Sequence, residues 1–173
     1  MPTILTPRLR LISCSLQLID AILAGDDALA DYLNVEVPAN WSNFGLPIFE
    51  FARDKIISHP DDEIWYTYLP ILTETNTLIG SCGYKGKPDE AGVVEIGYEV
   101  SVQQRGKGYA TEIATHLVQH ALQHPDVIKV WAHTLPENNP SALILEKIGF
   151  QKIAEVTDIE DGEIWRWAFL NGN

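Results

Sequence analysis

The sequence predicts an α/β (α+β) fold in which one mixed sheet is flanked by helices. The first observation is Val93–Val100, where apolar and polar residues alternate with the period of a half-buried strand. The second is Ala110–Leu122, where apolar residues recur at the spacing of one helix face. Further short apolar runs, bounded by Pro, Gly and Asn, surround this central pair. At 173 residues, the chain suits a single domain, 1–173.

The elements before the central pair follow from local patterns. Leu9 and Leu11 alternate with arginines in Thr6–Leu11, which indicates a first strand. We then expect, in order, two short helices across Leu16–Leu33 broken near Gly25, a loop over Pro38–Pro47, a helix over Ile48–Ser58, and strands over Trp65–Leu72 and Thr77–Tyr84. Pro70 cannot donate to a strand ladder, so it implies an edge strand or a bulge.

The loop over Pro38–Pro47 carries two aromatic residues, Trp41 and Phe44. Aromatic side chains in such a segment usually belong to the core. The alternative is that they form a wall of a substrate pocket, because loops are where a common fold places specificity.

The elements after the central pair are strands around one short helix. We expect, in order, strands over Ile128–Thr134, Gln151–Val156 and Glu163–Leu170, the last two joined by a turn at Asp158–Gly162. Pro140 suits the first helical position and Asn139 the N-cap, while Gly149 suits the left-handed residue that ends the helix.

Composition and charge narrow the functional classes. A hydrophobic content of 46% is ordinary for a globular protein, and neither a membrane-spanning run nor a signal peptide is apparent. Cys14 and Cys82 suggest no disulfide framework, so the reducing cytoplasm is the expected location. A net charge of −12 argues against direct nucleic-acid binding and would favour encounter with amines or basic protein tails, although solubility alone accounts for most carboxylates.

The segment Gln103–Gly108 joins the central strand to its helix and contains two glycines and two cations. Backbone N–H groups at a glycine-rich helix N-terminus form an anion site, because the first-turn donors lack intrahelical partners. The nucleoside-triphosphate P-loop does not fit, since Gly108 follows Lys107 where Ser or Thr is needed. The dinucleotide fingerprint also fails, because Thr111 occupies the place of its third glycine.

The pattern Q-x-x-G-x-G in Gln103–Gly108 instead resembles the pyrophosphate loop of the GNAT superfamily of acyl-CoA-dependent N-acyltransferases. Further along, Asn138–Phe150 resembles a second signature of that superfamily, N-x-x-[SA]-x-x-x-L-E-K-x-G-F, although a well-capped short helix alone would also explain it. The opening T-x-R-L-x-L of Thr6–Leu11 resembles the branch that acetylates the N-termini of ribosomal proteins. The resemblance implies a mostly antiparallel central sheet, acetyl-CoA as co-substrate and no metal.

The resemblance also implies which residues bind the co-substrate. The backbone N–H groups expected at the pyrophosphate belong to Gly106, Lys107, Gly108, Tyr109 and Ala110, with Arg105 adding charge. The residues expected at the pantetheine arm or the thioester carbonyl are Val100 and Val102, through backbone groups, and Asn138.

Three residues are candidates for the chemistry. Glu95 matches the position where many superfamily members place a general base, and Glu99 is the second choice. The two share a strand face roughly 13 Å apart at about 3.3 Å per residue, and a solvated face is the alternative for both. Many members protonate the departing thiolate with a tyrosine at the position of Leu145, which cannot donate. Ser141 is therefore the candidate donor, unless its hydroxyl only bonds backbone at the helix N-terminus.

A row of titratable residues spaced four apart lies on the central helix, at Glu112, His116, His120 and His124. Histidines at this spacing can ligate a metal. Because the row lies opposite the apolar stripe, we expect a solvated surface instead. His133, on a strand, is expected to be a packed core histidine.

Together these features predict an N-acetyltransferase that moves an acetyl group from acetyl-CoA to a primary amine of a small molecule or a protein N-terminus. The alternative is a catalytically silent acyl-CoA-binding module that regulates a partner, and a third reading is a plain nucleotide binder. Neither a nucleic acid nor a membrane is an expected partner. The sequence leaves open the acceptor amine and whether two chains associate as a homodimer.

Overall fold

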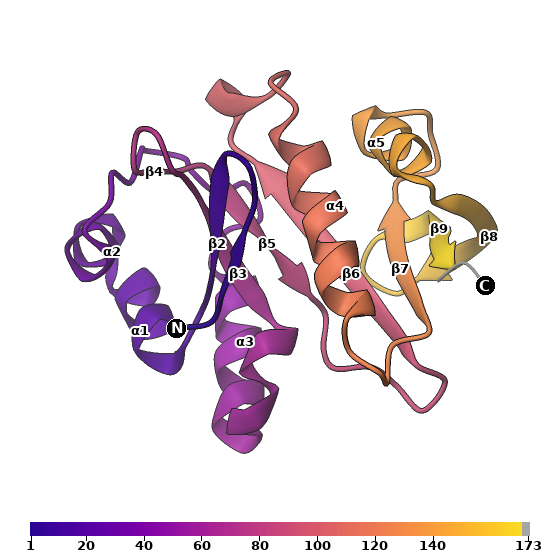
Figure 1. Cartoon of the computed structure of the whole chain (residues 1–173), viewed down its shortest axis with the longest axis horizontal. Helices are drawn as coiled ribbons and strands as arrows, with labels where there is room; N and C mark the ends of the chain where they lie inside the picture. Colours follow the sequence, from indigo (N-terminus) through magenta and orange to yellow (C-terminus); the bar gives the residue numbers. More distant parts are fainter. Residues whose placement is uncertain (171–173) are drawn as a thin grey trace.

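The computed structural model describes residues 1–170, which form a nine-stranded sheet with helices around it (Figure 1). The strands are β1 (Thr3–Leu5), β2 (Leu9–Ser13), β3 (Thr67–Leu72), β4 (Thr77–Leu78), β5 (Gly80–Tyr84), β6 (Val93–Val100), β7 (Lys129–Thr134), β8 (Gln151–Asp158) and β9 (Gly162–Leu170). The α-helices are α1 (Leu16–Ala24), α2 (Asp26–Leu33), α3 (Pro47–Ser58), α4 (Tyr109–Leu122) and α5 (Pro140–Ile148). Short 3-10 turns lie at Pro60–Trp65 and Val102–Gln104.

The sheet confirms the predicted mixed, mostly antiparallel architecture. Its strand order is β1-β2-β3-β5-β6-β7-β9-β8, with β4 beside β3. The neighbours β6 and β7 run parallel, and the other paired strands of the described chain run antiparallel. Figure 1 shows α4 running along β6, with α1 and α2 towards one end of the sheet and α5 towards the other.

The fully buried strand β3 shows that both faces of the sheet are covered. Tyr68 and Leu72 belong to the cluster that includes the buried residues of α4. Leu69 and Ile71 belong to a second cluster, with the buried residues of α1 and α3. Because side chains alternate along a strand, these helices lie on opposite faces. Burial of each such leucine or isoleucine stabilises the fold by roughly 1.5–3 kcal/mol.

The first strand differs from the prediction. Thr6–Leu11 is not one strand, because β1 ends at Leu5 and β2 begins at Leu9. Pro7 lies in the turn between them, where its missing N–H costs no ladder bond. The Thr6 N–H donates to the Leu9 carbonyl at 3.0 Å, and the Thr6 hydroxyl accepts from the Leu9 N–H at 2.9 Å. The segment is therefore a hairpin.

The next two predicted strands are also shorter than expected. Trp65 ends a 3-10 turn that begins at Pro60, and its ring packs 5.2 Å from that of Tyr84. Pro70 lies in an interior strand, so the edge alternative is wrong. The partner strand is interrupted opposite it: Ile79, between β4 and β5, donates its N–H to the Pro70 carbonyl at 3.1 Å. Because the partner strand is irregular here, Pro70 fits into the sheet although it has no N–H to donate.

The predicted helix boundaries hold where capping chemistry is local. Gly25, at φ 123°, separates α1 from α2. The Asn139 side chain accepts from the Ala142 N–H at 2.9 Å, and Gly149, at φ 107°, ends α5 in the left-handed region. These are the features expected of an N-cap and a C-terminal glycine.

The row Glu112, His116, His120 and His124 does not form the solvated surface that we expected, because this face of α4 meets the β1–β2 turn, Trp65 and Tyr84. Glu112 is 10% exposed and bonds Arg8. The His120 Nδ1 lies 2.9 Å from the Tyr84 hydroxyl, and His124 packs 4.7 Å from the Trp65 ring. Burial, reinforced by neighbouring His124, lowers the pKa of His120. Among residues 1–170, no group of three His, Cys, Asp or Glu side chains is arranged to hold a metal ion.

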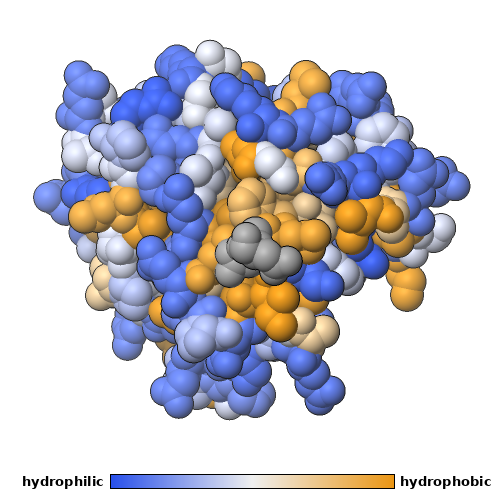
Figure 2. All heavy atoms as spheres, turned by 45° about the vertical axis from the view of Figure 1, so that its right-hand side comes forward, coloured by the Kyte–Doolittle hydropathy of each residue, from blue (hydrophilic) through white to orange (hydrophobic). Residues whose placement is uncertain are grey.

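The surface is largely polar, as Figure 2 shows for the face turned forward there, and the broadest of its apolar areas lies beside the C-terminal end of the described chain. None of the helices within residues 1–170 is long and apolar enough to cross a membrane.

Candidate active site

A gap between β6 and β7 organises the site. The two strands pair only through Val93–Glu95 and Lys129–Trp131. Beyond these residues β6 continues beside β5, while β7 continues beside β9. The carboxyl ends of the two strands therefore separate, and helices α4 and α5 both begin near this opening.

A cavity of about 900 Å³ lies at this opening, and we call it the loop cavity. Its walls come from the end of β6, the glycine loop with the start of α4, the start of α5 and the loop before α3. The lining residues are Asn43, Phe44, Tyr98, Glu99, Val100, Gln104, Arg105, Gly106, Gly108, Tyr109, Ala110, Thr111, Leu135, Asn139, Pro140, Ser141, Leu143 and Ile144.

The N-terminus of α4 is open towards an anion. Gly106 and Gly108 adopt left-handed φ values of 74° and 82°. Gly108 is the N-cap and has no side chain to cap this helix, whereas the Asn139 side chain caps α5. The first-turn N–H groups of α4 are therefore free for a ligand, at the positive end of a 14-residue helix. The Arg105 Nε donates to the Val100 carbonyl at 3.2 Å, which ties the loop to β6.

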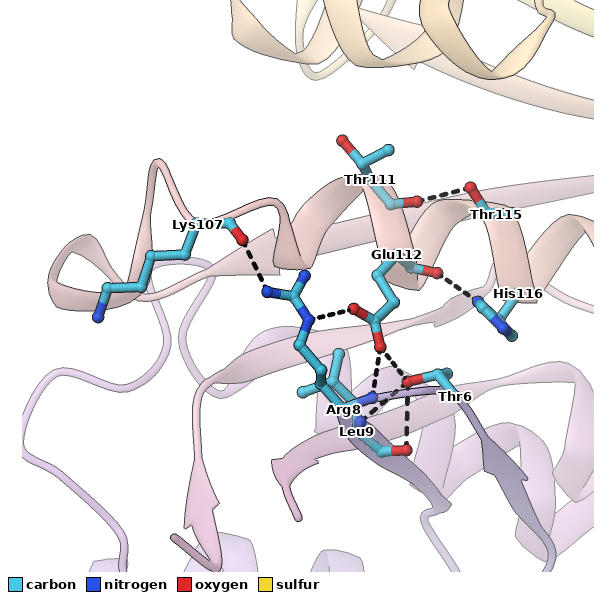
Figure 3. Close-up of polar contacts among 8 residues, drawn as sticks. All are labelled: Thr6, Arg8, Leu9, Lys107, Thr111, Glu112, Thr115 and His116. Carbon is cyan, nitrogen blue, oxygen red and sulfur yellow. Dashed lines mark hydrogen bonds and ion pairs between the residues drawn. The ribbon is translucent and has the colours of Figure 1, made fainter. Parts of the chain in front are cut away.

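The loop is held from behind by Arg8 and Glu112, as Figure 3 shows. The Arg8 guanidinium donates to the Lys107 carbonyl at 3.0 Å and to the Glu112 carboxylate at 2.7 Å, and it lies 4.4 Å from the Tyr109 ring centre. Glu112 also accepts from the Thr6 hydroxyl at 2.6 Å. Burial would raise the pKa of Glu112, but the bonds from Thr6 and Arg8 lower it below its ordinary value.

Sequence reasoning missed this support. Thr6 and Arg8 belong to the opening T-x-R-L-x-L pattern, which was the available signal, but nothing local indicated that they would meet Glu112.

Three of the predicted binding residues lie outside the wall of the loop cavity. Val102 is 61% exposed in its 3-10 turn. The Lys107 ammonium donates to the Gln104 side chain at 2.9 Å. Asn138 is exposed, and its neighbour Asn139 lines the cavity instead.

A second cavity, of about 600 Å³, adjoins the first, and we call it the aromatic cavity. Its walls come from α3 and the loop before it, β3, β5, β6 and the β8–β9 turn. The lining residues are Phe44, Pro47, Ile48, Phe51, Ala52, Tyr66, Thr67, Ser81, Cys82, Gly83, Tyr84, Lys85, Gly97, Tyr98 and Glu160. The two cavities share Phe44 and Tyr98. Trp41, by contrast, is buried against Phe49, so one aromatic residue of the loop is core and the other is wall.

Tyr98 is a site residue that sequence reasoning placed only on an apolar strand face. Its hydroxyl oxygen is buried and has no hydrogen-bond partner within residues 1–170. Burial raises the pKa of Tyr98 to about 12, and the nearby Ser141 hydroxyl opposes that shift. The group therefore stays protonated at neutral pH. In the sequence, the signal for Tyr98 was a hydroxyl-bearing residue among the apolar positions of β6.

Leu145 is buried in the core and, as a leucine, has no proton to donate.

Glu99 is 7% exposed, and both of its carboxylate oxygens are occupied. One oxygen accepts from the hydroxyls of Ser42 and Ser81 at 2.6 and 2.7 Å. The other accepts from the backbone N–H groups of Asn43 and Phe44 at 2.7 and 3.0 Å. The carboxylate therefore fixes the loop that carries Phe44 between the two cavities.

Glu95 lies on the same strand face but in a different environment. Its Oε1 lies 2.6 Å from the Lys85 ammonium and 2.8 Å from the His133 Nδ1. His133 is half-buried and also accepts from the Arg166 Nε at 3.0 Å. It therefore connects Glu95 to Arg166 through hydrogen bonds and is not the packed core histidine that we expected. Burial would raise the pKa of Glu95, but the bond from His133 and the charge of Lys85 lower it. Glu95 lines a third cavity of about 260 Å³, which shares Lys85 with the aromatic cavity.

Comparison with known proteins gives a consistent result. Residues 8–151 match the acetyltransferase (GNAT) domain family. The chain is 29% identical over 166 residues to the uncharacterized N-acetyltransferase YjdG of Bacillus subtilis, covering 95% of this chain and 96% of that protein.

Two solved structures share the fold at low sequence identity. RimL, a ribosomal L7/L12 α-N-protein acetyltransferase solved in complex with coenzyme A, has a TM-score of 0.67 at 15% identity over 98% of both chains. A chimera of the spermidine N-acetyltransferase SpeG from Vibrio cholerae and hSSAT has a TM-score of 0.65 at 16% identity, over 94% of this chain and 95% of that one.

Proposed function

The chain belongs to the GNAT acetyltransferase family, and on that premise we propose that it transfers an acetyl group from acetyl-CoA to a primary amine by direct attack on the thioester. The observation that carries this proposal is the pair of adjoining cavities that share Phe44 and Tyr98. The loop cavity receives the donor and the aromatic cavity receives the acceptor, so the reacting atoms meet at Tyr98.

The residues of the loop cavity fit a coenzyme A molecule. The uncapped first turn of α4 and the left-handed glycines before it suit a pyrophosphate. We assign this contact to the backbone N–H groups of Gly106, Gly108, Tyr109 and Ala110, with Arg105 adding positive charge, and we assign the pantetheine arm to the end of β6 at Val100. We leave Val102, Lys107 and Asn138 out, because none of the three lines the cavity. The bound co-substrate supplies the thioester.

Glu95 is the proposed base. Its carboxylate is ionised at neutral pH, and among residues 1–170 no side chain or backbone group bonds its Oε2. Glu99 is unsuited to this role, because each of its oxygens already accepts two hydrogen bonds. The low pKa of Glu95 makes it a weak base, so the amine must also be helped to lose its proton by its surroundings.

The proposed proton donor is the hydroxyl of Ser141, supported by the neighbouring Tyr98. In the reaction the amine nitrogen forms a bond to the thioester carbonyl carbon, and the carbon–sulfur bond breaks with its electron pair remaining on sulfur. One proton leaves the nitrogen towards Glu95 through water, because Glu95 lines neither of the two adjoining cavities. One proton reaches the sulfur from the hydroxyl pair, which is reprotonated from solvent. The products are an N-acetylated amine and the free thiol of coenzyme A.

Thiol release from acetyl-CoA in the presence of primary amines tests this function. We expect turnover by the wild type, and we expect Glu95→Gln to keep its acetyl-CoA affinity while kcat/KM falls by about 10²–10⁴ near pH 7. The loss should shrink at higher pH, where the amine deprotonates without help. Ser141→Ala and Tyr98→Phe, in the same assay, should lower kcat with little change in acetyl-CoA affinity.

Glu74→Gln is the matched control, because Glu74 is exposed in the turn before β4. An unchanged kcat/KM and pH profile in Glu95→Gln would remove Glu95 from the mechanism. Binding of acetyl-CoA without turnover of any amine would instead identify a silent acyl-CoA-binding module.

A further inference from the structure

The walls of the aromatic cavity are mostly apolar and aromatic, although the protein has a net charge of −12. Ring-bearing residues line it from the loop before α3, from α3, from the residue before β3 and from β6. They are Phe44, Phe51, Tyr66 and Tyr98. Pockets of this composition bind ligands mainly through apolar contact, with a few polar groups that set orientation.

Fixed negative charge is scarce in this cavity. Glu99 lines the other cavity and has both oxygens occupied, while Glu95 lies beyond Lys85 in the third cavity. The carboxylate that lines the aromatic cavity is that of Glu160, on the exposed β8–β9 turn. Lys85 is also at the wall, and its ammonium pairs with Glu95 at 2.6 Å. A second ammonium group on an acceptor would therefore find no unpaired buried carboxylate among the described residues of this cavity, so the aromatic rings would offset only part of its desolvation cost.

Space for an apolar body lies beside the reacting position. Gly97 precedes Tyr98 on β6, and a Cβ built at Gly97 would meet no atom within 4 Å. The volume of about 600 Å³ is ample for a ring-sized group whose amine points to the shared residue Tyr98.

Resting on the function proposed above, we propose that the acceptor is a primary monoamine whose amino group is attached through a short link to an aromatic or similarly ring-sized apolar body. The body lies between α3 and Gly97, and the amine lies at Tyr98.

The apolar walls have a second effect on the acceptor, because removal of the amine from water disfavours its ammonium form. The cavity thereby supplies the neutral nucleophile that a weakly basic Glu95 would produce slowly.

The test compares four primary amines at saturating acetyl-CoA by thiol release. They are 2-phenylethylamine, phenylalaninamide, n-propylamine and spermidine. We expect kcat/KM for both ring-bearing amines to exceed that for n-propylamine and spermidine by about 10-fold or more, the scale of discrimination that an apolar pocket provides. The better of the two ring-bearing amines distinguishes a free amine from a peptide N-terminus with an aromatic side chain, and either result supports the proposal.

A substitution at Gly97 tests where the apolar body of the acceptor lies. Gly97→Leu should fill the cavity without backbone strain, raise KM for 2-phenylethylamine about 10-fold or more and leave acetyl-CoA affinity by calorimetry unchanged. Ala91→Leu, at an exposed loop position, adds the same side chain elsewhere and serves as the control.

The outcomes separate this inference from the function it rests on. Preference for spermidine or n-propylamine overturns the acceptor class and leaves amine acetylation standing. An unchanged KM for 2-phenylethylamine in Gly97→Leu overturns the placement of the body. No thiol release with any of the four amines, despite acetyl-CoA binding, would overturn both.

Discussion

The two adjoining cavities are built in different ways. The loop cavity takes much of its wall from one continuous stretch, Val100–Thr111, and offers backbone N–H groups at an uncapped helix. The aromatic cavity is assembled from side chains of α3, β3, β5, β6 and the β8–β9 turn. A backbone site binds the same phosphate whatever the nearby side chains are, whereas a side-chain site changes its ligand with each substitution. Donor chemistry and acceptor choice can therefore vary separately in this fold.

The largest expected effect comes from blocking the backbone site. Gly106→Trp forces a large residue into a left-handed conformation at φ 74° and obstructs the first turn of α4. We expect acetyl-CoA affinity by calorimetry to fall on the order of 100-fold, because several charge-assisted hydrogen bonds are lost together. Gly162→Trp is the strain control, since Gly162 has a φ of 71°, an added Cβ there meets no atom within 4 Å, and the residue lies far along the chain. Equal affinities in the two variants would refute the assignment of the donor to the loop cavity.

An intermediate effect should reach both cavities at once. Glu99→Gln replaces an acceptor of four hydrogen bonds with an amide that cannot accept them all. We expect the free energy of unfolding in urea to fall by about 1–3 kcal/mol. KM should rise for acetyl-CoA and for the amine together, because Phe44 lines both cavities.

Ser81→Ala is the matched comparison for the unfolding measurement, since it removes one of the same bonds without touching the loop. If Glu99→Gln raised KM for only one substrate, Phe44 would not be the shared wall.

The smallest effect concerns the support behind the loop. The pKa of Glu112 is lower in the folded protein than its ordinary value, so the unfolded chain binds more protons as the pH falls. The stability that Glu112 provides is thus present above its unfolded pKa, about 4.3, and is lost as the pH drops through its folded pKa. Glu112→Gln should lower the free energy of unfolding by about 1 kcal/mol at pH 7. The difference in the free energy of unfolding between Glu112→Gln and wild type should narrow in urea titrations near pH 3. A difference that does not depend on pH would contradict this account.

The contrast between the cavities also explains what the sequence could predict. Gly106 and Gly108 act through their own backbone, and Asn139 and Gly149 bond within their own helix, so a local pattern identifies all four. The environment of His120 could not be predicted in this way, because residues far away in the chain cover that helix face.

Long-range partners limited the carboxylate assignments as well. Glu99 accepts three hydrogen bonds from residues 42–44, more than fifty positions earlier in the chain. Periodicity places both glutamates on one strand face, as the structure does, but only the fold reveals that one is bound on both oxygens and the other is not.

The separation of β6 from β7 has a consequence for the lifetime of the protein. Three residue pairs join these strands, and the edges beyond them are where the co-substrate is proposed to lie. A molecule that binds the folded chain there, and not the unfolded chain, stabilises the fold in proportion to the logarithm of its free concentration. Resistance to proteolysis would then rise and fall with the supply of acetyl-CoA. The amount of enzyme, and not only its rate, would follow the metabolic state of the cell.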